Sequence, residues 1–435
     1  MKKRRFVLFG FVSIFGLASC ASITLKDGLI YAAKNVSIEE AYNTKTEAFI
    51  DAAVKLNNFS GKLTERLINS NVNDNIAVSP LSAYMALAMT QALAGGDSKT
   101  EILDTLNMSE KEILGFTRTL YNTSQRSDKV NGKNILKEIL TNSVWLDNSI
   151  SYKDDALKNL SEYYGANSYH LDFKHDNSAA NKAIRSFVKD NTNGLIDHNF
   201  GLTDDTVFSL INTLYLKDIW NIGGDDLNYI KNKQTFYNNN GEIINRKFLE
   251  SNYNLCVAID KGSYTVCDTN TTGFNISFVL PNDGYQLADV FTSDTISYMA
   301  SNDYDLLSYD LALDEENMQE HYTRIVFPKF TGKYDGDLCE PLKNLGIKKI
   351  FTGNADFSPL TDGVAYVDSI SQSTILKVDE KGIEGASVTI VKGSMSEGPG
   401  EWESVYHDFL LNKAFGYVVR DENNIPLFAG VVNNI

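Results

Sequence analysis

The segment Val378–Val391 has the sequence VDEKGIEGASVTIV, contains no proline, and passes through a glycine into residues that favour strands. Successive side chains of a strand point to opposite faces. One face then carries no charge, and its residues are Ile383, Gly385, Ser387, Thr389 and Val391. Because an unpaired charge is costly to bury, this face is suited to burial, whereas Glu384 and Lys392 fall on the opposite face. The segment therefore predicts a strand that can be added to a sheet.

The N-terminus has the parts of an export signal. Basic residues at positions 2–5 precede a largely apolar run, Phe6–Ala18, which is shorter than the roughly 20 residues of a membrane span. The run ends in Leu17-Ala18-Ser19-Cys20, which resembles a bacterial lipobox and predicts lipidation of Cys20. An ordinary cleaved signal with an incidental cysteine is the alternative. We expect a lipoprotein signal at 1–20, a tether at 21–44, a folded domain at 45–435, and an exported protein held at the cell surface by its lipid.

Composition excludes some partners. The chain has 435 residues, with 40 Lys and Arg against 56 Asp and Glu, a net charge of −16. With no long basic run after the signal, nucleic acid is not expected as a partner. A hydrophobic content of 43% is sufficient for a sizeable core.

The cysteines do not form a recognisable metal or disulfide pattern. Besides Cys20 they are Cys256, Cys267 and Cys339, an odd number at irregular spacing. Residues 257–266 can form a hairpin that places Cys256 opposite Cys267, so a disulfide between them and a pair of half-buried thiols both remain open. We expect no metal and no cofactor.

Hydrophobic periodicity predicts helices first and strands later. Glu47–Asn69 has helical spacing, and a second helix begins after Ser79, the predicted cap, and ends at Gly95-Gly96. Thr206–Leu216 is apolar on both faces, as in the middle of a sheet, and its Asn212 needs hydrogen-bond partners or costs roughly 1–3 kcal/mol. Further strands are predicted at Ile325–Phe330, Ser373–Lys381, Phe409–Val419 and Leu427–Asn433, with a short helix at Leu338–Leu345. This order, without a βαβ rhythm, favours the α+β class.

Several short motifs occur in the order found in serpins, the serine-protease inhibitors. They are NIAVSPLS at 75–82, TNGLI at 192–196, the strand with its tryptophan at 205–220, SFVLPNDG at 277–284, FPKF at 327–330, LGI at 345–347 and ADFS at 355–358. Residues Thr46–Ile435 as a whole resemble this family. The resemblance implies an α+β fold with three β-sheets, about nine helices and an exposed reactive-centre loop.

The resemblance also implies a function. Serpins are suicide substrates of serine, and in some cases cysteine, proteases, and their cleaved loop becomes a strand of the central sheet. The expected partner is an extracellular target protease, the protein is expected to be a monomer, and no catalytic residue is needed. The implied hinge of the loop is Glu380, Lys381, Gly382, Ile383, Glu384, Gly385, Ala386 and Ser387. The implied sheet-opening residues are Ser79, Ser82, Asn212, Trp220 and Gln372.

Loop length places the cleavage site. Counting from Gly382 at the usual family spacing puts the scissile bond near Ser396-Glu397, with Met395 one residue before it. Counting back from 412–415 lands later, near Glu403, so the loop is about seven residues longer than usual, or roughly 23 Å of extended chain. Such slack before the cut would leave the protease undistorted, so we place the insertion after it, at 397–404. Methionine or serine at the cut favours a chymotrypsin- or elastase-like target.

Three residues depart from the family pattern, and two other functions remain as alternatives. Gln372 replaces a histidine, so this position does not titrate near neutral pH, and Ile383 and Gly385 replace a small polar residue and an alanine. Ile383, Gly385 and the long acidic loop motivate one alternative, a non-inhibitory serpin that serves as a surface binding protein. A hydrolase is disfavoured, since no G-x-S-x-G elbow, H-E-x-x-H or P-loop is present and His407 near Ser404 is interpreted as a surface-loop residue.

Overall fold

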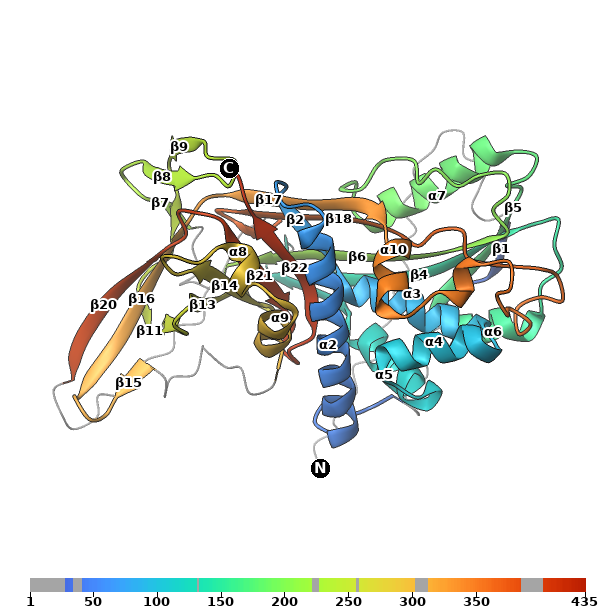
Figure 1. Ribbon diagram of the computed structural model, residues 1–435, viewed down its shortest axis with the longest axis horizontal. Coiled ribbons are helices and arrows are strands. Elements are labelled where there is room, and N and C mark those ends of the chain that lie inside the picture. Colours follow the sequence, from blue (N-terminus) through green and yellow to red (C-terminus); the bar gives the residue numbers. More distant parts are fainter. Residues whose placement is uncertain are drawn as a thin grey trace, which may run out of the picture.

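A computed structural model describes residues 28–33, 41–130, 133–220, 227–255, 258–301, 312–384 and 402–435 (Figure 1). This part of the chain contains nine α-helices and three large β-sheets, which confirms the α+β class. The helices are α2 (Glu47–Asn69), α3 (Pro80–Leu93), α4 (Gly96–Leu106), α5 (Glu110–Thr123), α6 (Asp154–Tyr163), α7 (Asn177–Asn191), α8 (Leu287–Val290), α9 (Ser293–Met299) and α10 (Cys339–Leu345). A short 3-10 helix spans Lys349–Phe351.

The first sheet has eight strands and runs through the length of the molecule. In order across the sheet they are β1 (Leu29–Tyr31), β5 (Ala166–Leu171), β4 (Lys133–Asp147), β6 (Phe208–Ile219), β19 (Gly382–Ile383), β18 (Ser371–Asp379) and β17 (Phe330–Asp337), and β3 (Gln125–Val130) pairs with β4. The predicted strands Thr206–Leu216 and Ser373–Lys381 correspond to β6 and β18 at its centre.

Two further sheets and a hairpin complete the strands. The second sheet contains β7 (Asn228–Tyr229), β10 (Leu249–Glu250), β11 (Asn254–Leu255), β15 (Leu313–Asp314), β16 (Gln319–Phe327) and β20 (Glu403–Leu410). The third contains β2 (Ile76–Val78), β12 (Ile259–Asp260), β13 (Tyr264–Asn270), β14 (Asn275–Pro281), β21 (Phe415–Arg420) and β22 (Pro426–Val432). The hairpin is β8 (Gln234–Tyr237) with β9 (Ile243–Arg246).

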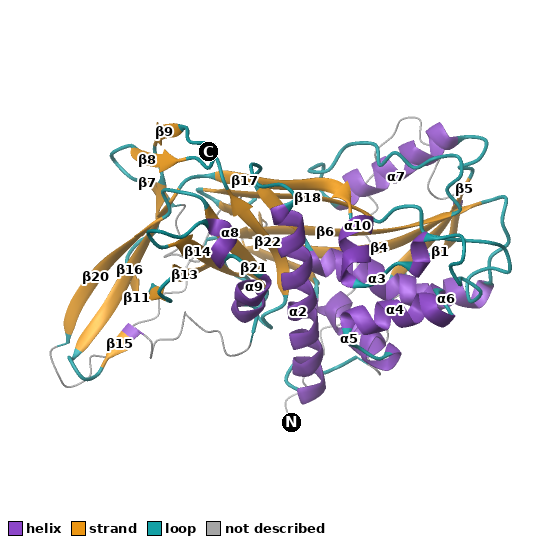
Figure 2. Cartoon of the chain, viewed as in Figure 1, coloured by secondary structure: helices purple, strands orange, loops and turns teal. Residues whose placement is uncertain are grey.

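The first sheet is covered on both faces. Figure 2 shows α3 to α6 on one side of its long strands and α7 on the other. Side chains such as Leu210 of β6 and Leu376 of β18 join the main core with α3, whereas Ile211 and Ile375, one residue away on each strand, pack on the smaller cluster under α7. Even-numbered residues of both strands therefore face α3, and odd-numbered residues face α7.

The helices predicted from sequence have nearly the expected boundaries, but two predicted strands are wrong in extent. The helices Glu47–Asn69 and Pro80–Leu93 have the predicted ends, and the Ser79 side chain caps α3 as expected. Ile325–Phe330 is not one strand, because Pro328 has no N–H to donate and the chain changes sheets between Phe327 and Phe330. Phe409–Val419 is likewise divided, since the chain crosses from the second to the third sheet between β20 and β21.

Several sequence predictions fall on other parts of the chain. The signal 1–20 with Cys20 lies outside the described residues, and so does Cys256, the predicted partner of Cys267. Leu29–Tyr31, inside the predicted tether, pairs with β5 as an edge strand, so at least this piece is in contact with the domain. In the described ranges no helix combines the length and apolarity needed to cross a bilayer.

Candidate functional site

The centre of the first sheet is open. Strands β6 and β18 are separated in the sheet order by β19, which is only two residues long, and no ladder joins β6 to β18 directly. Among the described residues, the facing edges at 208–217 and 371–377 therefore have no strand partner, although the opposite edges pair fully with β4 and β17. We call this gap between β6 and β18 the slot. It is a place where another strand can be added, because exposed strand edges offer rows of N–H and C=O groups.

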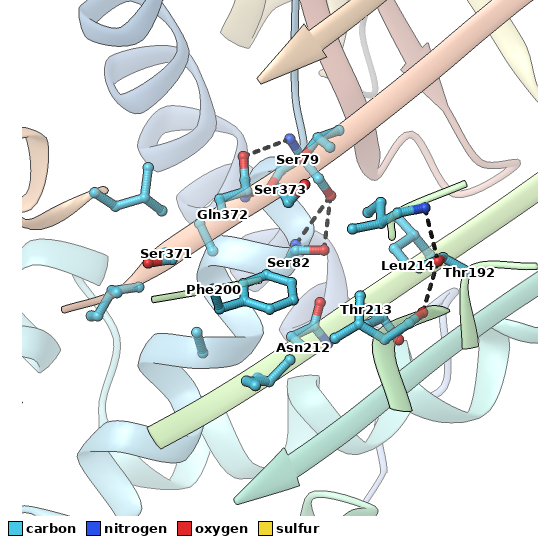
Figure 3. A pocket seen from close by; sticks show the side chains of 18 of the residues that line it. Ser79, Ser82, Thr192, Phe200, Asn212, Thr213, Leu214, Ser371, Gln372 and Ser373 are labelled. Atoms are coloured by element: carbon cyan, nitrogen blue, oxygen red, sulfur yellow. Dashed lines mark hydrogen bonds between the residues drawn. The ribbon is translucent and has the colours of Figure 1, made fainter. Parts of the chain in front are cut away.

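The slot is lined from above and below. Ser79, Ser82 and Ala86 of the α3 region lie on one side, and Thr192 and Phe200 of the segment after α7 lie on the other (Figure 3). Much of the lining consists of small hydroxyl side chains, which fit next to an incoming backbone. The sequence had already singled out Ser79, Ser82, Asn212 and Gln372 as sheet-opening residues, and all four lie at the slot.

Gln372 ties β18 to the start of α3. Its Oε1 accepts from the Ser79 N–H at 3.1 Å and its Nε2 donates to the Ser79 carbonyl oxygen at 2.8 Å. The Ser79 hydroxyl lies 3.0 Å from that of Ser82. Gln372 thus supplies a donor and an acceptor at one position without titrating near neutral pH.

Replacing Gln372 by leucine should destabilise the uncleaved protein. Ser79 is buried, so its N–H and C=O would lose their partners at roughly 1–3 kcal/mol each. We expect a lower thermal midpoint by several degrees in calorimetry. Ser371→Ala, at an exposed position of the same strand, is the control and should leave the midpoint unchanged. An unchanged midpoint in Gln372→Leu would show that this link does not stabilise the sheet.

Asn212 is paired on one side only. Its Nδ2 donates to Asn142 Oδ1 at 2.6 Å, and Asn142 Nδ2 donates to the Tyr164 carbonyl oxygen. Asn212 Oδ1 is buried and has no partner among the described residues. Sequence reasoning missed Asn142, although Leu136, Leu140 and Val144 alternate around it and place it in the buried phase of a strand.

The chain turns back into the slot directly after β18. β19 is antiparallel to both neighbours, with Ile383 opposite Val378 on one side and Asp218 on the other. Gly382 has φ +140°, and a Cβ there would collide with the Asp218 carbonyl oxygen, so this turn requires glycine. Ile383 is 1% exposed and faces the main core.

Glu384 is the last described residue of the hinge. Its φ of +46° lies in the left-handed region, which is unfavourable for an ordinary side chain. Its Oε1 accepts from the Tyr215 hydroxyl at 3.1 Å, and the second carboxylate oxygen is buried and has no partner in the described part of the chain. Burial, followed by the Glu384 charge, raises the pKa of Tyr215. The hinge is therefore held in a strained conformation after only two paired residues.

Contacts at the mouth of the slot hold the turn. Trp220 is 2% exposed, and its Nε1 donates to the Asp379 carbonyl oxygen at 2.7 Å. Glu380 Oε2 lies 2.9 Å from Lys329 Nζ and accepts from the Tyr229 hydroxyl at 3.2 Å. The hydrogen bond from Lys329 lowers the pKa of Glu380, and hydrogen bonds with Tyr229 and Glu380 raise that of Lys329. Lys381 donates its N–H to Asp379 Oδ1.

A histidine fastens the segment after α7 to the slot. His198 Nε2 lies 2.8 Å from the Ser373 hydroxyl of β18 and 3.5 Å from Asp335 Oδ1 of β17. Its ring also contacts Phe200, which lines the slot. Sequence reasoning did not single out His198, because its partners lie far along the chain.

The remaining predicted site residues lie outside the described residues. They are the hinge positions Gly385, Ala386 and Ser387 and the cleavage-site residues Met395, Ser396 and Glu397. Of the predicted insertion at 397–404, only 402–404 is described, and Glu403 already belongs to β20.

Comparison with known proteins agrees with this architecture. The family model described as "Serpin (serine protease inhibitor)" matches residues 54–435. Alpha-1-antiproteinase 2 of Equus caballus is 25% identical, with 87% of this chain and 86% of that protein aligned. The crystal structure of the thermophilic serpin tengpin in its native state has a TM-score of 0.71 at 23% identity and covers 95% of this chain and 99% of its own. Thyroxine-binding globulin in complex with thyroxine has a TM-score of 0.70 at 21% identity, covering 88% and 99%.

Proposed function

The chain belongs to the serpin family, and we propose that it inhibits an extracellular serine or cysteine protease as a suicide substrate. The protease attacks a peptide bond in the loop that follows Ile383. Its serine or cysteine forms an ester or thioester with the residue before the cut, and the amine of the next residue leaves. The cleaved loop then enters the slot as a strand and carries the protease with it. The inhibitor supplies no catalytic residue and no cofactor. It supplies an open sheet and a loop that fits it.

The observation that supports this proposal is that the loop has already entered the slot in register. Gly382 and Ile383 pair antiparallel with both β18 and β6, and we extend this register along both edges. It would place Gly385 between Leu216 and Leu376, and Thr389 between Asn212 and Gln372. The uncharged face of the segment would then point toward α3, where the lining is small and polar.

Thr389 would meet the one unpaired amide oxygen of the slot. In this register its side chain shares a face with Asn212 and Gln372, because residues directly opposite each other in a ladder lie on the same side. Asn212 Oδ1 has no donor within the described ranges of the uncleaved protein. The Thr389 hydroxyl is a suitable donor. Insertion would therefore satisfy a group that the open sheet leaves unpaired.

The slot length agrees with a cut near Ser396. β6 begins at Phe208, and the register places this residue opposite position 393. A protease attached at Ser396 would travel about 13 residues beyond Ile383, or roughly 43 Å, past the far end of the strand. Attachment at Lys392 would give only about 30 Å and would leave the protease alongside the sheet.

The proposal includes the cellular setting. We infer an exported monomer that is held at the cell surface through a lipid on Cys20, facing extracellular proteases. Contact with the membrane is through the lipid anchor only. This setting follows from the N-terminal pattern of the sequence alone.

The decisive experiment tests for a covalent complex. Residues 21–435 are mixed with chymotrypsin, elastase, trypsin, subtilisin and papain, and the products are separated on denaturing gels. We expect a band of summed mass with a chymotrypsin- or elastase-like enzyme. Each protease inactivated at its active-site nucleophile is the control and should give no band. Cleavage of the loop by every enzyme, with no complex, would contradict inhibition.

A second candidate is a non-inhibitory serpin that acts as a surface binding protein. The observation that favours it is that Ile383 is already buried, while Glu384 has a left-handed φ and a carboxylate hydrogen-bonded to Tyr215. One similar structure is a binding globulin by name. In that case the loop would be cut without complex formation and without any gain in thermal stability.

A further inference from the structure

A pair of histidines lies on the second sheet, away from the slot. His321 of β16 and His407 of β20 are two of the chain's five histidines. The two strands form a parallel ladder from Gln319 opposite Glu403 to Val326 opposite Leu410, and Figure 1 shows them projecting side by side from one end of the molecule. His407 was expected in a surface loop, and the structure places it instead in this paired strand.

The two imidazoles face each other at a short distance. His321 Nδ1 lies 2.9 Å from His407 Nε2, and the rings are stacked with an interplanar angle of 19°. Two nitrogens that bind one metal at about 2.0–2.1 Å lie roughly 2.9 Å apart when they are adjacent in an octahedron and about 3.4 Å apart in a tetrahedron. The two nitrogens now point at each other in a hydrogen bond, and small rotations of the two side chains would bring both onto one metal ion.

The surroundings favour a cation. Asp314 of β15 and Glu403 of β20 are both opposite Gln319, one step along the same face from His321. The Asp314 carboxylate accepts from the Asn317 N–H and side-chain amide, and Glu403 accepts from Gln319. His407 is exposed and His321 is half-buried, so an ion can reach the nitrogens from solvent.

We propose that His321 and His407 together bind one divalent transition-metal ion such as Zn²⁺. Imidazole is a preferred ligand of zinc, copper and nickel. Binding needs lone pairs on both facing nitrogens, so the ring that donates the present hydrogen bond shifts its proton to its other nitrogen. Within the described ranges no cluster of three or more His, Cys, Asp or Glu residues could hold a metal, so water completes the coordination.

The site would join the two strands of the ladder. β20 is the strand that follows the loop, and β16 belongs to the body of the second sheet. An ion held by one histidine from each strand would fasten the C-terminal end of the loop. Since the ion binds the folded protein, it should also raise the thermal midpoint as its concentration increases. The inference does not depend on the proposed inhibition.

Calorimetric titration with ZnCl₂ tests the site on untagged residues 21–435. We expect one equivalent to bind, and His321→Ala and His407→Ala each to weaken binding at least tenfold. His175→Ala removes another exposed histidine far from the pair and should bind as the wild type does. Thermal midpoints without metal show whether each variant folds. The proposal would be overturned if the wild type bound no zinc, or if both pair variants bound it as tightly as the wild type does.

Discussion

Gly385→Pro should convert the inhibitor into a substrate. In the register set by β19, an inserted residue 385 would lie between Leu216 and Leu376, in the middle of the sheet. Proline has no N–H to donate to either edge and is excluded from central strands. Insertion would stop next to Glu384, and the acyl-enzyme would be hydrolysed before the protease moved. On denaturing gels we expect the covalent band to disappear and the cleaved protein to accumulate, with a more than tenfold rise in the stoichiometry of inhibition.

A proline on the other side of the predicted cut is the matched control. Gly398→Pro changes the same loop in the same way, but position 398 does not enter the slot, so the covalent band should persist. The thermal midpoints of the two uncleaved variants should match that of the wild type, which separates a block of insertion from a folding defect. A full covalent band with Gly385→Pro would mean that the loop does not act by insertion.

The local parts of the fold were predictable because their causes are local. The ends of α3 follow from the Ser79 cap, the proline at the first turn and the spacing of its apolar residues, all within one segment. β6 was found because its residues are apolar on both faces, as in the middle of a sheet. These features depend on neighbours in the sequence, and the sequence displays them directly.

The missed features depend on pairing between distant segments. β16 and β20 are joined by a parallel ladder, and their histidines meet only because residues 321 and 407 fall on neighbouring strands. The partial insertion of the hinge is also absent from the sequence pattern, which predicts a strand but not how many of its residues are paired. Asn142 is an intermediate case. The alternation of apolar residues in its strand predicts that it is buried, but its partner Asn212 is known only from the pairing of β4 with β6.

The partly filled slot leads to the second large prediction, which concerns stability after cleavage. A protease that cuts near Ser396 and is then removed should leave a protein with a higher thermal midpoint than the uncleaved form. The free edges of β6 and β18 gain a partner along 208–217 and 371–377, and the left-handed conformation of Glu384 becomes extended. A gain of about 5 kcal/mol would raise the midpoint of a domain of this size by roughly 6 °C, and we expect at least that.

Thr389 tests whether the stabilisation comes from the predicted register. Thr389→Val keeps the shape of the side chain but removes the hydroxyl, so Asn212 Oδ1 would stay unpaired in the inserted sheet at a cost of roughly 1–3 kcal/mol. The cleaved variant should therefore melt several degrees below the cleaved wild type, whereas the uncleaved forms should melt together. Thr389→Ser keeps the donor and should retain most of the gain. If Thr389→Val and Thr389→Ser gained equally on cleavage, the loop would insert in another register, and if cleavage raised no midpoint at all, it would not insert.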